Sequence, residues 1–184
     1  RSILTHTPTV ATILVVDDNS PDGTAGRVRQ FKKTHKTNTR VNLLVRTINR
    51  GLTNSLKAGI AASKSDVVGW MDCDFSHPPI VLPQLIAAIT RGADIAIATR
   101  FFQTTTGTPV NQSSVNFMAQ TKLSIWLNSF LSYLFGSNIT DYTTGFLAVR
   151  RAVLDHIPLR GNYGEYCIDL LVRAQGAGYH IEEI

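Results

Sequence analysis

Short apolar runs alternate with amphipathic segments along the first half of this chain. Runs without polar alternation are typical of buried parallel strands, and they lie at residues 13–16, 43–45, 67–71 and 95–99. Apolar residues at helical spacing predict helices after the polar turn at 17–24, over 52–63 and over 79–90. This alternation indicates an α/β domain with a Rossmann-like, mostly parallel sheet flanked by helices.

The second half of the chain opens with a polar segment and continues with the longest helical one. Residues 102–112 predict a loop over the strand ends, and residues 114–135 predict a helix rich in aromatic side chains. This helix either packs on the sheet, which is the favoured interpretation, or lies at a membrane interface with its wide apolar face. Further elements are expected at 147–149 (strand), at 151–157 and from 165 (helices), and over 179–184 (strand).

Two carboxylates follow the apolar run at 67–71. Asp72 and Asp74 are separated by one residue, so their side chains share a face if the extended backbone continues through them. Neighbouring carboxylates repel one another unless a cation lies between them, and oxygen ligands suit a hard ion such as Mg2+ or Mn2+. The alternative is that both acids only cap the helix that begins near Pro78, because a lone D-x-D pattern is common.

Polar residues after the neighbouring strands favour the metal interpretation. Asp17 and Asp18 follow the first apolar run, and Arg100 follows the fourth. The carboxyl ends of parallel strands meet at one edge of an α/β sheet, where ligands bind. We therefore expect one rim of the sheet to collect Asp17, Asp18, Asp72, Asp74 and Arg100.

Composition and charge limit the functional classes. The chain has 184 residues, 43% of them hydrophobic and 17% charged, which predicts one globular domain. Its net charge of +5 suits anionic ligands, including nucleotide diphosphates and acidic lipid surfaces. Neither a nucleic-acid motif nor an apolar run of the roughly 18 residues that a transmembrane helix needs is present. Cys73 and Cys167 form no metal or redox spacing, so a reducing cytosolic setting is expected.

Five motifs carry a resemblance to a known family. They are VVDDNSPDGT at 15–24, NRGL at 49–52, MDCDFSHPP at 71–79, TR at 99–100 and DYTTGF at 141–146. In this order they resemble the family-2 glycosyltransferases of GT-A fold, in the branch of dolichol-phosphate mannose synthases and related polyprenyl-phosphate glycosyltransferases. The resemblance implies that residues 1–184 form one catalytic domain, truncated at both ends, without the family's first strand and its C-terminal segment.

The resemblance implies an activity and a location. The implied reaction is an inverting, metal-dependent transfer of a sugar from a nucleotide donor to a polyprenyl phosphate such as dolichyl phosphate. GDP-mannose is the first choice of donor and UDP-glucose the second, with Mg2+ or Mn2+ as the ion. The implied location is the cytoplasmic face of a membrane, where the protein is peripheral or held by an anchoring subunit or tail.

The family motifs also imply site residues. The donor would bind at Asp17, Asp18, Asp72 and Asp74, and the metal would bind at Asp72, Asp74 and Ser76. Asp74 is also one of the two expected catalytic residues.

The second expected catalytic residue is Arg100, which matches an arginine proposed to hold the acceptor phosphate. Lys122 is expected to replace a further arginine that relatives carry near position 120. The sugar pocket would be shaped by Asp141, Gly145 and Phe146.

Two alternatives stay open. A family-2 transferase with a saccharide acceptor would need a carboxylate general base, for which Asp141 and Asp169 are candidates. A non-catalytic relative would only bind a nucleotide sugar or a partner protein, and the intact Asp72, Asp74 and Arg100 argue against it.

Overall fold

The computed structural model describes residues 2–7, 12–35, 40–74, 77–99, 115–135 and 139–184, and of residues 115–124 it describes the backbone only. The strands are β1 (Ile13–Asp17), β2 (Val41–Val45), β3 (Val67–Trp70), β4 (Ile95–Ile97), β5 (Leu147–Arg150) and β6 (Ile181–Glu183). The helices are α1 (Ser2–His6), α2 (Thr24–Thr34), α3 (Leu52–Ala62), α4 (Leu82–Arg91), α5 (Val115–Phe135), α6 (Arg151–His156) and α7 (Glu165–Gly176).

The predicted helices and strands are present, with ends that differ by a residue or two. The predicted helix at 79–90 is divided into a 3-10 turn, η1 (Pro79–Val81), and α4, because prolines occupy the first positions of both segments. Helix α1 was not predicted. The expected loop at 102–112 lies outside the described residues.

The strands form two sheets. β1 and β2 pair in parallel, and the larger sheet has the order β3-β5-β4-β6. β5 is antiparallel to both β3 and β4, whereas β4 and β6 are parallel, so β3, β4 and β6 share one direction. The mostly parallel sheet is thus confirmed. The reversal of β5 was not predicted, because an apolar run at 147–149 carries no mark of strand direction.

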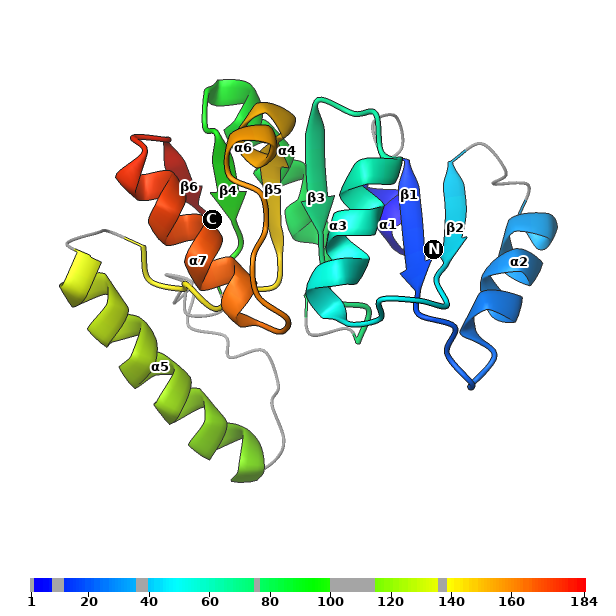
Figure 1. The fold of residues 1–184 in the computed structure, drawn as a ribbon, viewed down its shortest axis with the longest axis horizontal. Helices are drawn as coiled ribbons and strands as arrows, with labels where there is room; N and C mark the ends of the chain where they lie inside the picture. The colour runs from blue at the N-terminus through cyan, green and yellow to red at the C-terminus, as the bar shows by residue number, and fades with distance from the viewer. Residues whose placement is uncertain (1, 8–11, 36–39, 75–76, 100–114, 136–138) are drawn as a thin grey trace.

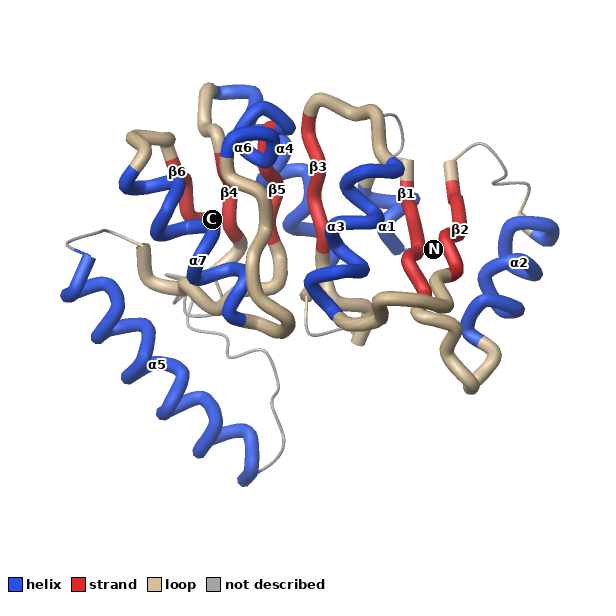
Figure 2. The backbone as a smooth tube through the Cα atoms, in the orientation of Figure 1, coloured by secondary structure: helices blue, strands red, loops and turns tan. Residues whose placement is uncertain are grey.

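Both faces of the larger sheet are covered by helices, as Figures 1 and 2 show. Ile95 and Ile97 of β4 belong to a core that α6 and α7 complete, whereas Ala96 belongs to a second core with α4. β5 alternates in the same way, since Leu147 and Val149 lie in the first of these cores. Strands covered on both faces leave only their ends for ligands.

Helix α3 joins the smaller sheet to the larger one. An added Cβ on Gly59 would lie 3.1 Å from Cγ2 of Val16 in β1, so this helix packs closely on the smaller sheet. Leu56 and Ile60 of the same helix pack against the core of the larger sheet. Helix α3 therefore packs against both the smaller sheet and the core of the larger one.

Helix α5 projects beyond the sheet (Figure 1). Asn128 and Leu131 are buried on its inner face, whereas Trp126 is 65% exposed and Tyr133 is 88% exposed. The rings of Trp126 and Phe130 are stacked with centroids 5.9 Å apart. The inner face therefore contacts the first core through Leu131, but the helix projects beyond the sheet and does not lie on it as the favoured interpretation predicts. The outer face presents aromatic side chains. No helix in the described part of the chain is long and apolar enough to cross a bilayer.

We expect core packing under α4 to dominate the stability of the second core. Leu85 is fully buried there, so Leu85→Ala should lower the free energy of unfolding by about 2–5 kcal/mol. Ile80 of the preceding turn is 59% exposed, and Ile80→Ala should change it by about 0.5 kcal/mol or less. Urea unfolding of both variants tests this, and equal losses would contradict the assignment of Leu85 to a core.

Candidate functional site

The carboxyl ends of β1 and β3 lie at the same edge, which is the lower edge in Figure 1. Asp17 is the last residue of β1, and Asp72 follows β3 by two residues. These positions agree with the predicted rim of acids. Ser76 and Arg100 lie outside the described residues, and so does the side chain of Lys122.

Asp72 lies among the residues that were expected to shape the sugar pocket. Its Oδ2 atom is 3.5 Å from Nε2 of His77, a buried side chain whose ring is tilted on that of Phe146 at a centroid distance of 5.2 Å. An added Cβ on Gly145 would lie only 2.8 Å from the same Oδ2 atom. The structure therefore brings Asp72, Gly145 and Phe146 together, and the buried ring of His77 lies beside the carboxylate of Asp72.

The last residue of β3 contacts a buried tyrosine. The indole Nε1 of Trp70 donates a hydrogen bond of 3.1 Å to the hydroxyl oxygen of Tyr166. Burial raises the pKa of Tyr166 well above its usual value, and the nearby charges of Cys167 and Asp72 raise it further. The hydroxyl therefore stays neutral at physiological pH and does not add a charge to the site.

The strand argument that placed Asp72 and Asp74 on one face is wrong. β3 ends at Trp70, and Asp74 lies in a bend. Pairing stops there because Trp70 is opposite Leu147, the first residue of β5. Both acids are nevertheless exposed at the strand end.

The donor set at this strand end fits a hard divalent ion. The described residues contain no group of three or more His, Cys, Asp and Glu side chains that would enclose a metal. Mg2+ commonly binds one or two carboxylates and completes its shell with water and phosphate oxygens. Asp72 suits such an open site, because its side chain is 56% exposed, and Gly145, which has no Cβ, lets the carboxylate lie close to the backbone of the segment before β5.

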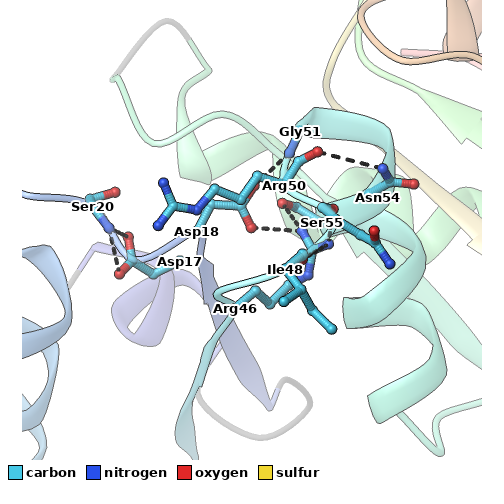
Figure 3. A network of polar contacts seen from close by, with 10 residues as sticks. Asp17, Asp18, Ser20, Arg46, Ile48, Arg50, Gly51, Asn54 and Ser55 are labelled. Carbon is cyan, nitrogen blue, oxygen red and sulfur yellow. Dashed lines mark hydrogen bonds and ion pairs between the residues drawn. The ribbon is translucent and has the colours of Figure 1, made fainter.

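Asp17 ends β1, and Asp18 begins the polar turn that follows it, as Figure 3 shows. Asp17 is buried and accepts weak hydrogen bonds of 3.3 and 3.4 Å from the backbone N–H of Ser20. Asp18 accepts one of 2.7 Å from the backbone N–H of Gly51 and pairs with Nη1 of Arg46 at 2.6 Å. One carboxylate thus ties the end of β1 to the turn before α3.

Arg46 is the centre of this network, and the sequence analysis missed it. Its Nη1 atom also donates to Oγ of Ser55 at 2.6 Å, and its Nη2 atom donates to the backbone oxygens of Ile48 and Asn49. Its side chain is only 10% exposed. The available signal was a lone arginine directly after the apolar run of β2, where a charge needs a partner.

These contacts change the acidity of Asp18. Partial burial alone would raise the pKa of Asp18, but hydrogen bonds with Gly51 and Ser55 and the positive charges of Arg46 and Arg50 lower it below its usual value. Asn49 and Gly51 have positive φ angles of 50° and 119°, so the turn that meets this carboxylate needs a backbone that glycine adopts readily.

Asp141 is fully buried in the segment that leads to the pocket. Its Oδ1 atom accepts hydrogen bonds from the backbone N–H and the hydroxyl of Thr143, at 3.1 and 3.0 Å. Its own backbone N–H donates to Oε1 of Glu183 at 3.0 Å, a contact that the sequence did not suggest. Asp141 therefore supports the turn that carries Gly145.

The Asp18–Arg46 pair should make stability depend on pH. Because the pKa of Asp18 is lower in the folded state, its stabilisation is complete above the unfolded-state value of about 4 and is lost as pH falls through the folded-state value. Asp18→Asn should therefore be about 1–3 kcal/mol less stable than the wild type at pH 7, with a difference that shrinks towards pH 2. Urea unfolding at several pH values measures it.

The matched control for this prediction is Asp155→Asn, which changes an exposed aspartate of α6. It should follow the wild type at every pH. A stability difference for Asp18→Asn that is the same at pH 7 and pH 2 would contradict the lowered pKa.

Comparison with known proteins identifies a family and several relatives. The family model described as Glycosyl transferase family 2 matches residues 1–158. Polyprenol monophosphomannose synthase of Mycolicibacterium smegmatis is 35% identical over 178 residues, covering 94% of this chain and 64% of that protein. Dolichol-phosphate mannosyltransferase of Pyrococcus furiosus is 29% identical over 163 residues, covering 89% of this chain and 44% of that protein.

A solved structure with a similar fold is glucosyl-3-phosphoglycerate synthase from Mycobacterium tuberculosis in complex with Mn2+, UDP and glucosyl-3-phosphoglycerate. Its TM-score is 0.72 at 18% identity, and the match covers 99% of this chain and 63% of that one. This likeness confirms the expected GT-A fold. The chain spans less than two thirds of both the M. smegmatis and the P. furiosus relatives. By the family match and these relatives, the chain belongs to glycosyltransferase family 2.

Proposed function

We propose that this chain is the catalytic domain of an inverting glycosyltransferase that moves a sugar to a polyprenyl or dolichyl phosphate. Mannose from GDP-mannose is the first choice of donor, and glucose from UDP-glucose is the second. The observation that carries the proposal is an exposed carboxylate, Asp72, just after β3, packed closely against Gly145. The relatives named as polyprenol and dolichol-phosphate mannose transferases support the choice of acceptor.

The described carboxylates favour a phosphate acceptor over a saccharide. A saccharide hydroxyl needs a general base, whereas a phosphate oxygen is already anionic. Of the two candidate bases, Asp141 is fully buried and bonded to Thr143, and Asp169 pairs with Arg173 of the same helix. Asp141 is therefore closed to an acceptor hydroxyl, and Asp169 already pairs with an arginine.

The proposed donor and metal residues follow from the strand ends. Asp72 and Asp74, with Ser76, would hold Mg2+ or Mn2+, and when bound such an ion stabilises the negative charge of a departing nucleoside diphosphate. Asp17 and Asp18 would meet the nucleoside from the turn after β1. Asp18 is held for this role by Arg46 and Gly51.

The acceptor phosphate would bind to Arg100 and Lys122. Two anions must be held together for this transfer, and fixed cations reduce their repulsion. Asp74 and Arg100 are therefore the catalytic residues that we propose.

We further propose that the outer face of α5 lies on the cytoplasmic surface of a membrane, either alone or with an anchoring subunit or tail. Apart from Ser129, the exposed side chains of its described part are apolar or aromatic, and they include Ile125, Trp126, Phe130, Tyr133 and Leu134. Helices of this kind bury one face among lipid headgroups, and a net charge of +5 favours an anionic surface. A lipid acceptor would then meet the enzyme at its own surface.

The test of the reaction is sugar transfer by the full-length protein that contains this chain. Radiolabelled GDP-mannose and UDP-glucose are each incubated with dolichyl phosphate, with Mn2+ or with EDTA. We expect metal-dependent product from one donor and at least about a hundredfold loss in Asp72→Asn and in Arg100→Ala. Asp66→Asn is the matched control, because Asp66 is exposed just before β3.

Measurements of donor binding distinguish the role proposed for Asp72 from the role proposed for Arg100. Asp72→Asn should weaken Mn2+-dependent binding of GDP or UDP, whereas Arg100→Ala should leave it unchanged. Nucleotide binding without transfer from either donor would overturn the proposed reaction and favour a binding module.

The test of the membrane proposal is sedimentation with vesicles of phosphatidylcholine and phosphatidylserine. The double variant Trp126→Ser, Phe130→Ser should bind at least about tenfold more weakly, because two large apolar rings are removed from the lipid surface. The control is Tyr163→Ser, since Tyr163 is 75% exposed but precedes α7 and is remote from α5 in sequence. Equal binding by the double variant and the wild type would exclude α5 as the contact.

A further inference from the structure

A buried asparagine on the inner face of α5 binds the segment that leads to the pocket. Asn128 is only 1% exposed. Its Oδ1 atom accepts a hydrogen bond of 2.7 Å from the backbone N–H of Tyr142, and its Nδ2 atom donates one of 3.1 Å to Oγ1 of Thr143. The oxygen and the nitrogen of the Asn128 amide therefore form hydrogen bonds with two consecutive residues of this segment.

Other contacts of α5 meet the same segment. One turn after Asn128, Oγ of Ser132 donates to the backbone oxygen of Ile139 at 2.5 Å. The rings of Phe135 and Tyr142 lie 6.0 Å apart, and Leu131 is buried in the same core as Tyr142. The inner face of α5 thus contacts this segment at several points between residues 139 and 143.

The segment continues directly into the candidate site. Thr143, which Asn128 contacts, donates to Oδ1 of Asp141, and the hydroxyl of Thr144 donates to the backbone oxygen of Ala98 at 2.7 Å. The next residue is Gly145, which approaches the carboxylate of Asp72. A shift of α5 would therefore move the backbone that sets the space beside Asp72.

We propose that Asn128 is a positioning residue that couples the position of α5 on a lipid surface to the geometry of the backbone that leads to Gly145. An aromatic outer face and a hydrogen-bonded inner face lie on the same short length of helix. When the outer face lies on a lipid surface, the inner face holds residues 141–145 in the arrangement seen here. The inference rests on the proposed function in one respect, the lipid surface that bears the acceptor.

Asparagine is suited to this role because it offers one acceptor and one donor on a planar group. Alanine removes both contacts, so Asn128→Ala leaves the Tyr142 N–H without this acceptor. Thr143→Val keeps the shape of the side chain and removes its hydroxyl, which accepts from Nδ2 of Asn128 and donates to Oδ1 of Asp141. If Asn128→Ala does not fold, Thr143→Val still tests the coupling.

The experiment measures backbone hydrogen exchange in peptides that cover residues 139–146 of the full-length protein. Exchange is compared with and without vesicles of phosphatidylcholine and phosphatidylserine. We expect vesicles to slow exchange about fivefold or more in the wild type and in Ser129→Ala, whose side chain is exposed beside Asn128. Asn128→Ala and Thr143→Val should still sediment with the vesicles but lose most of this protection.

Three results would overturn the coupling. They are a wild type that does not bind vesicles, a wild type whose exchange in 139–146 is unaffected by vesicles, and variants that gain the full protection. A second readout is the ratio of transfer rates with vesicle-embedded and short-chain, water-soluble prenyl phosphate. This ratio should fall in both variants, whereas a merely structural defect would lower both rates equally. Protection by vesicles without any sugar transfer would reject the proposed reaction and retain the coupling.

Discussion

Burial of the central strands on both faces is the constraint on which the rest of this structure depends. Because β4 and β5 lie between two helical layers, the sheet can present chemistry only where its strands end. The site is consequently built from irregular backbone: the turns after β1 and β2, the bend after β3 and the segment before β5. Such segments have no ladder of their own, so their backbone groups need other partners.

Polar side chains with several partners supply what these segments lack. Arg46 fixes the turn before α3 against Asp18, and Asn128 fixes the segment before β5 against α5. Each is nearly buried and forms hydrogen bonds with both backbone and side-chain groups of the segment that it holds. Asp141 acts in the same way within its own turn. The exposed acid Asp72 therefore lies beside a segment that is itself held in place.

Much of the fold was predictable from the sequence, because burial imposes periodicity on strands and helices. The strands and the acids at their ends follow directly from apolar runs that stop at Asp17 and near Asp72. The antiparallel direction of β5 was not predictable. Its connection to β4 includes the long α5, and a short apolar run does not indicate the direction of a strand. The shared face of Asp72 and Asp74 failed as an argument because strand pairing ends at Trp70.

The partners of the site residues were harder to predict than the residues themselves. Arg46 and Asp18 are 28 residues apart, and Glu183 reaches Asp141 across 42 residues. No local pattern links such pairs, and a single arginine or glutamate after a strand is ordinary in a surface turn. The family resemblance named residues by their likeness to motifs, so it identified Asp18 and Asp141 but not the side chains that hold them.

The contact at Gly145 has a consequence for reading related sequences. A methyl group at this position would stand 2.8 Å from a carboxylate oxygen of Asp72, well inside normal contact distance, although no unusual backbone angle demands glycine there. In a related protein, a larger residue at position 145 would require the carboxylate of Asp72 to turn away, while the rest of the fold stayed intact. The residue at position 145 therefore limits the orientations that an aspartate at position 72 can adopt in a related chain.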